Sequence, residues 1–183
     1  MIITALRSYC RAVHFSVALV GKSVSYLMPI LAFVVAFEVV ARYFLNRPTI
    51  WAYDLSLFLF GYIAALGGAY AQQKRAHINV DILYLSVSPR TRSLFNLFSF
   101  TLAFFFVWVM FDMSLVKFDE ALEFNYRRQS EWAPHMHHFW VMVAVACSLM
   151  MAQLSTDILG DLYHLISGRK LLKTSTEENG HGN

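Results

Sequence analysis

The sequence predicts an all-α integral membrane protein with four transmembrane helices. Of its 183 residues, 57% are hydrophobic and only 15% are charged, whereas a soluble domain carries about 25% charged residues. The apolar residues gather in four stretches, each close to the ~20 residues that a helix needs to cross a hydrocarbon layer of ~30 Å. These predicted spans cover about residues 24–45, 52–71, 93–116 and 139–160.

The residues outside the spans are too few to form a separate soluble domain. We therefore expect a single four-span transmembrane domain over residues 1–173. Residues 174–183 form a tail of Thr, Ser, Glu, Asn, Gly and His, and this composition favours disorder. The tail is expected on the cytoplasmic side.

The first 22 residues do not resemble a cleavable signal peptide, because Arg7, Arg11, His14 and Lys22 interrupt any compact apolar core. On a helix, Arg7, Arg11 and His14 fall on one side and apolar residues on the other. The apolar side consists of Ile2, Ile3, Leu6, Cys10, Val13, Val17 and Val20. This pattern is typical of an amphipathic helix on an anionic membrane surface; the alternative is an extension of the first span.

The distribution of Lys and Arg predicts that both termini are cytoplasmic, because positively charged loops stay on that side of the membrane. Among the 15 such residues, those on the side of the termini are Arg7, Arg11, Lys22, Lys74, Arg75, Arg90, Arg92, Arg169, Lys170 and Lys173. Those on the opposite side are Arg42, Arg47, Lys117, Arg127 and Arg128. Cys10 and Cys147 are placed apart in this layout, so no disulfide is expected.

A tight outer turn is expected between the first two spans. Pro48 disfavours helical geometry in the residue before it, and the aromatic residues Tyr43 and Trp51 flank the break, where they suit the headgroup layer. Glu38 and Arg42 are four residues apart, so they share a helix face and can pair. Asp54 falls in the first turn of the second span, where a negative charge suits the helix dipole.

The second span is rich in small residues. Gly61 with Ala65, and Ala64 with Gly68, stand four residues apart, and such spacing allows close contact with another helix. Compact packing within the bundle is the alternative use of these residues.

A polar and apolar alternation follows the second span, at His77 to Ile82. Because an open strand edge is not viable at hydrocarbon depth, residues 77–88 are expected to form a short interfacial helix, or else a surface loop. In the helix, Asn79 would act as a cap, His77 and Asp81 could hydrogen-bond, and Pro89 would end the segment. Such a helix would set the angle between the second and third spans.

Polar residues within the last two spans need partners, because unpaired charges are costly in a membrane. Asp112 is the acid of the Phe-rich third span, and we expect Lys117 or water to satisfy it near the outer surface. Gln153, Asp157 and Asp161 are spaced four apart. We expect this polar stripe to contact another helix or the interface.

The order and spacing of the motifs over residues 38–83 resemble the small membrane subunit, DctQ type, of tripartite ATP-independent periplasmic (TRAP) transporters. The motifs are Arg42-Tyr43, Asn46-Arg47-Pro48, Trp51 with an acid three residues on, a small-residue span ending in Ala71, and His77-Ile78-Asn79-Val80-Asp81. The sequence departs from the family pattern at Asp54, where glutamate is usual, and at Ala76, where glycine is common. The charged outer loop 117–138 is also longer than the resemblance would lead one to expect.

The resemblance implies a scaffold subunit in the bacterial inner membrane. Its partners would be a large membrane subunit (DctM type) that moves the substrate, a periplasmic binding protein (DctP type) that delivers an organic acid, and membrane lipids. An ion gradient, such as sodium, would drive uptake. The structural and interface candidates are Glu38, Arg42, Trp51, Asp54, Gly61, Gly68, His77 and Asp81. The candidates for docking the binding protein are Arg127, Arg128, Glu131 and His135.

The alternative is a haem-bearing or structural anchor subunit of another inner-membrane complex. The histidines disfavour haem, because they do not form facing axial ligands within the bundle. His135 and His138 lie three residues apart at the outer mouth, but no cysteine or close carboxylate completes a metal site. Known catalytic and nucleotide-binding motifs are also missing. We therefore expect no cofactor, no metal, no enzymatic activity and no nucleic-acid partner.

Overall fold

The computed structural model describes residues 2–74 and 89–167, and within these ranges all regular structure is helical. The helices are α1 (Ile2–Ser25), α2 (Leu27–Tyr43), α3 (Ala52–Gln73), α5 (Pro89–Glu123) and α6 (His137–Ser167). The predicted all-α fold is therefore confirmed. The expected interfacial helix at 77–88, with the candidates His77 and Asp81, and the expected tail at 174–183 lie outside the described residues.

Four apolar helical stretches are long enough to cross a membrane, as the sequence predicts. They are Ile3–Tyr43, Ala52–Gln73, Leu94–Glu123 and His137–Ile166. Most of their large apolar side chains are exposed on the surface of the bundle. Such exposure is what a lipid solvent allows, because lipid tails are as apolar as the side chains themselves.

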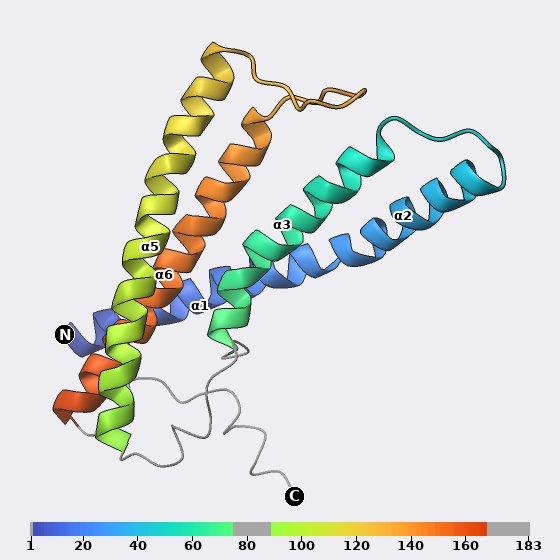
Figure 1. The fold of residues 1–183 in the computed structure, drawn as a ribbon. Coiled ribbons are helices and arrows are strands. Elements are labelled where there is room, and N and C mark those ends of the chain that lie inside the picture. The colour runs from blue at the N-terminus through green and yellow to red at the C-terminus, as the bar shows by residue number, and fades with distance from the viewer. Residues whose placement is uncertain (1, 75–88, 168–183) are drawn as a thin grey trace, which may run out of the picture.

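The first stretch consists of two helices that follow one another along a long rod (Figure 1). Only Tyr26 separates α1 from α2. Pro29 has no N–H to donate to the carbonyl of Ser25, and its ring crowds that carbonyl, so a regular helix cannot continue through this point. At the junction, the Tyr26 N–H donates to the Ser23 carbonyl at 3.3 Å and the Ser25 hydroxyl donates to the Lys22 carbonyl at 2.7 Å. The N-terminal segment is thus a helix that ends at Ser25, but α2 follows it after one residue and the two form one apolar stretch, so both the interfacial helix and the extension of the first span stay open.

Helices α3 and α6 form the centre of the bundle. Helix α3 contacts α1, α2 and α6, whereas α6 contacts α1, α3 and α5. Helix α5 packs mainly along α6, as its antiparallel neighbour, and α1 passes behind α6 in the view of Figure 1 and contacts both α3 and α6. The chain thus forms two helical hairpins, α2–α3 and α5–α6, joined at one end through α1.

Helix α5 extends further at its outer end than the sequence predicts. It ends at Glu123, so the expected outer loop 117–138 shrinks to residues 124–136. Lys117 and Glu120 form an ion pair at 2.6 Å on this last part of the helix. Pairs three residues apart stabilise a helix, and Lys, Glu, Ala and Leu all favour it, so the charged segment Lys117–Glu123 continues the helix instead of forming a loop.

Close contact between α1 and α3 depends on Gly21. A Cβ atom at this position would lie 2.5 Å from both Cβ and Cγ of Tyr70, which is far inside van der Waals contact. The buried residues Cys10, Val17 and Val24 lie on the same side of α1. The face of α1 expected to contact lipid is therefore in part packed against other helices.

Replacing Gly21 with alanine should destabilise the bundle. Although alanine favours a helix by up to about 1 kcal/mol over glycine, the clash with Tyr70 is expected to cost about 1–3 kcal/mol by overpacking. The matched control is Gly67→Ala on α3, where an added Cβ meets no atom within 4 Å. Unfolding by SDS in mixed micelles, followed by circular dichroism, measures both. Equal stability of the two variants would contradict the role given to Gly21.

Candidate functional site

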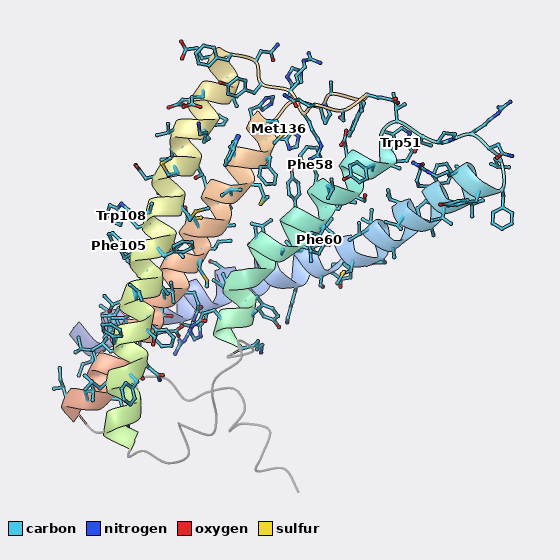
Figure 2. All side chains as sticks on the ribbon, viewed as in Figure 1. Trp51, Phe58, Phe60, Phe105, Trp108 and Met136 are labelled. Carbon is cyan, nitrogen blue, oxygen red and sulfur yellow. The ribbon has the colours of Figure 1, made fainter. Side chains whose placement is uncertain are left out.

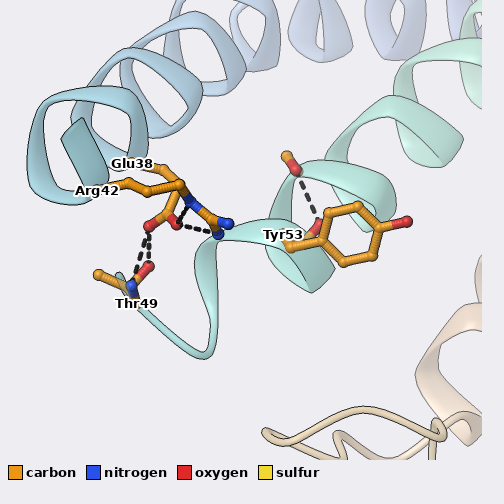
Figure 3. A network of polar contacts seen from close by, with 5 residues as sticks. Glu38, Arg42, Thr49 and Tyr53 are labelled. Carbon is orange, nitrogen blue, oxygen red and sulfur yellow. Dashed lines mark hydrogen bonds and ion pairs between the residues drawn. The ribbon is translucent and has the colours of Figure 1, made fainter. Parts of the chain in front are cut away.

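The outer turn between α2 and α3 is closed by Glu38 (Figure 3). One carboxylate oxygen of Glu38 accepts from Arg42 at 2.6 Å, which is the ion pair that their spacing predicts. The other oxygen accepts from the backbone N–H of Thr49 at 3.2 Å and from the Thr49 hydroxyl. Asn46 lies in this turn with φ 49°, a left-handed conformation that asparagine adopts more readily than most residues. Glu38 therefore holds the turn onto the end of α2.

Trp51 supports the same turn from its apolar side. Its ring stacks on Phe37 with centroids 6.0 Å apart. It also packs against the small core between α2 and α3, formed by Val34, Ala52 and Leu59. The turn is thus held by a polar network on one side and an aromatic contact on the other.

Asp54 forms the most buried ion pair of the described residues. Its side chain is 1% exposed and lies 2.8 Å from Nε of Arg128. The Ser130 hydroxyl donates to the second carboxylate oxygen. The guanidinium of Arg128 also lies over the Tyr53 ring, 5.9 Å from its centroid. Asp54 does occupy the first turn of α3, as expected, but its partners come from the loop between α5 and α6.

The loop at 124–136 folds back on itself as a short hairpin. Arg128 N–H donates to the Pro134 carbonyl and Met136 N–H to the Tyr126 carbonyl, each at 3.0 Å. The loop extends from the α5–α6 pair toward the beginning of α3 (Figure 1). Arg128 is paired with Asp54 and is partly exposed, so its charge is engaged within the chain and its assignment as a docking residue stays a prediction. Arg127 and Glu131 are exposed and His135 is half-buried, so these three side chains reach the surface of the described chain.

The first turn of α6 is attached to α3 through His138. Its Nδ1 lies 2.5 Å from the Tyr62 hydroxyl, and the Phe58 ring meets the imidazole edge-on at 4.8 Å. At Gly61, a Cβ atom would lie 3.3 Å from the Phe139 ring, whereas at Gly68 it would meet nothing within 4 Å. Gly61 therefore serves a contact inside the chain, and of the two glycine candidates only Gly68 stands at an open position.

A second polar cluster joins α1, α3 and α6 at their inner ends. Asp157 accepts from Gln72 and from Gln153, both at 3.1 Å. The Gln73 amide donates to the His14 carbonyl at 2.9 Å. Because Gln153 is 0% exposed, the polar stripe of α6 faces other helices, as the sequence analysis expects.

Helix α1 takes part in this cluster through His14, which was expected on the polar side of the helix, and through Tyr9. His14 Nε2 lies 3.5 Å from the Thr156 hydroxyl, so His14 faces α6 and its predicted place on the polar outer side is wrong. Tyr9 and Ser155 join the same two helices by a hydroxyl pair at 2.8 Å. The helical wheel could not show that α1 crosses two helices and so contacts protein on more than one side.

The chemistry of the described residues is that of helix attachment. In these parts of the chain, no three His, Cys, Asp or Glu side chains come together in a way that could hold a metal ion. The polar residues described above occur at the two ends of the bundle, where they connect one helix to another. The described helices are thus connected by polar contacts at both ends of the bundle, and much of the loop at 124–136 is exposed.

Residues 31–163 match the family model of tripartite ATP-independent periplasmic transporters, DctQ component. A part of 84 residues is 26% identical to the sialic acid TRAP transporter permease protein SiaT of Haemophilus influenzae, covering 46% of this chain and 14% of that protein. A part of 89 residues is 24% identical to the C4-dicarboxylate TRAP transporter small permease protein DctQ of Vibrio cholerae, covering 49% of this chain and 38% of that protein. The matched parts thus span well under half of either relative.

Breaking the pair between Asp54 and Arg128 should loosen the outer end of the bundle. We expect Asp54→Ala and Arg128→Ala each to lower the free energy of unfolding by about 1–3 kcal/mol, since one charge is left without its partner at a partly buried site. Because the two residues form one contact, the double variant should lose clearly less than the sum of the single variants.

The matched control for this cycle is Arg127→Ala. Arg127 is exposed, and substitutions of that kind usually change stability by no more than about 0.5 kcal/mol. Unfolding in SDS measures the free energy of unfolding of the three variants in the cycle and of this control. Strictly additive effects of Asp54→Ala and Arg128→Ala would show that the pair is not coupled.

Proposed function

The chain belongs to the family of the DctQ component of tripartite ATP-independent periplasmic transporters, and we propose that it works as the scaffold subunit of such a transporter. In this role it supports a large membrane subunit that moves the substrate. This family is a transporter component and not an enzyme family, which favours the scaffold over the haem-bearing alternative. The chain would reside in the bacterial inner membrane with both termini in the cytoplasm.

The observation that carries this proposal is the bracing of the helices at both ends. Glu38 and Asp54 hold the outer turns and loops, and Asp157 joins α3 to α6 at the inner ends. A subunit that stays stationary while its partner moves gains from such fixed connections. Each one restricts the movement of one helix relative to another. Among the described residues, Asp54 and Asp157 are engaged in contacts between different helices or loops, which favours a structural use of these carboxylates.

The proposed cargo is an organic acid. The two relatives are named for sialic acid and for C4-dicarboxylates, and both names denote organic acids. We propose that a periplasmic binding protein delivers the acid and that an ion gradient, such as sodium, drives its uptake through the large subunit. The substrate and coupling sites would then lie in the partner subunit.

The outer loop is the proposed contact for the binding protein. Arg128 and Ser130 attach the loop to α3, so the loop presents Arg127, Glu131 and His135 from a fixed position. Exposed charges of this kind typically affect the association rate and the register of a complex more than its stability. Gly68 and the turn between α2 and α3 stay as candidates for contact with the large subunit.

Purification from native membranes in mild detergent tests the scaffold role. We expect a tagged copy to recover a large polytopic subunit, identified by mass spectrometry, and to show no Soret band. A lone chain with a haem absorbance band would contradict the proposal. The absorbance spectrum thus separates the two alternatives in one sample.

Reversing charges on the loop tests the docking role. In Arg127→Glu combined with Glu131→Lys, we expect the large subunit to be recovered normally and transport to fall, since only the contact with the binding protein is altered. The transport rate as a function of binding-protein concentration measures this effect. The amount of large subunit recovered with the double variant is the internal control, since lost assembly would also lower transport. Unchanged transport in the double variant would exclude the loop as the docking site.

A further inference from the structure

Helix α5 has two unlike faces. The face toward α6 carries Ser114 and Ala121, which are 1% and 2% exposed, together with partly buried residues such as Phe104 and Phe111. The opposite face follows the spacing of four and three residues and is exposed throughout. Its members are Phe98, Leu102, Phe105, Val109, Asp112 and Val116. Figure 2 shows Phe105 projecting from α5 on the side away from the rest of the bundle.

Asp112 is the anomalous member of this outward face. It is exposed, and within the described residues it takes part in no hydrogen bond or ion pair. It lies one turn inside the end expected for the third span, with Val109 and Val116 exposed on the turns before and after it. A short carboxylate at this depth cannot extend to the headgroups as a long lysine can, and an unpaired charge in a span is costly and needs a partner.

Lys117, the basic partner expected from the sequence, does not pair with Asp112. Lys117 lies five residues further on, about 140° around the helix from Asp112 at ~3.6 residues per turn. Its amine is also already paired with Glu120 at 2.6 Å. Arg42 and Arg128 are likewise paired, with Glu38 and Asp54. Of the two partners expected for Asp112, Lys117 is therefore wrong, whereas water stays an untested prediction; within the described residues no basic side chain pairs with this carboxylate.

We propose that the outward face of α5 is the surface on which a transmembrane helix of the large subunit packs, and that a basic side chain of that helix pairs with Asp112. The identity of the partner rests on the proposed function. Charge complementarity points to the occupant, because a carboxylate within an apolar face is best satisfied by a lysine or arginine opposite. A second copy of this chain is a poor occupant, since Arg47 and Arg127, the outer basic residues with no partner described above, lie in loops and not on helices.

Neutralising Asp112 in the assembled complex tests this contact. For Asp112→Asn, we expect the apparent dissociation constant between the subunits in mild detergent to rise roughly five- to thirty-fold, the range of a polar contact between membrane helices. The matched control is Asp119→Asn, an exposed carboxylate two turns further along α5. Because it lies beyond the end expected for the third span, where water can solvate it, this change should leave the dissociation constant unchanged. The ratio of subunits recovered over a detergent series gives the readout. Equal recovery of the two variants would overturn the proposed pair.

A photo-crosslinking residue placed on α5 identifies the occupant directly. At Val109, on the outward face, we expect an adduct with the large subunit, whereas at Val107, which is half-buried toward the bundle, we expect none. An adduct of Val109 with lipid alone or with a second copy of this chain would overturn the proposal. If the wild-type chain recovers a large subunit but Val109 forms no adduct with it, only this inference fails. If no large subunit is recovered at all, the proposed function fails with it.

Discussion

The ion pair between Asp54 and Arg128 is the contact on which the arrangement of the outer ends depends. It joins the beginning of α3 to a loop that belongs to the other helical hairpin. The carboxylate is nearly fully buried, so it requires both the guanidinium and the Ser130 hydroxyl to offset the loss of water. This site attaches the loop to the first turn of α3, while His138 attaches the first turn of α6 to α3 and Glu38 closes the α2–α3 turn.

The inner ends are held by a different kind of chemistry. Here neutral amides and hydroxyls from α1, α3 and α6 surround Asp157 and His14. In a membrane, apolar side chains gain little from leaving lipid, so helices associate through close packing and polar contacts. The bundle uses both, with close packing at Gly21 against Tyr70 and polar contacts at either end.

This arrangement explains why α5 differs from the other helices. It packs mainly along α6 and has few polar residues directed at the bundle, so most of its surface is directed outward. Because α3 and α6 make most of the contacts between helices, α5 can pack along α6 and leave its opposite face exposed. The exposed carboxylate of Asp112 on this helix and the exposed charges of the outer loop are the features that the internal contacts of the described chain do not account for.

The sequence by itself determined the helical class, the four apolar stretches and the Glu38–Arg42 pair, because each follows from composition or from a spacing along one helix. Only the tertiary structure decided that Asp54 pairs with Arg128, that Gly21 rather than Gly61 or Gly68 admits the closest helix contact, and that His14 faces α6. These contacts join residues far apart in the chain. Their formation depends on how the helices cross, and periodicity along a single helix carries no information about that crossing.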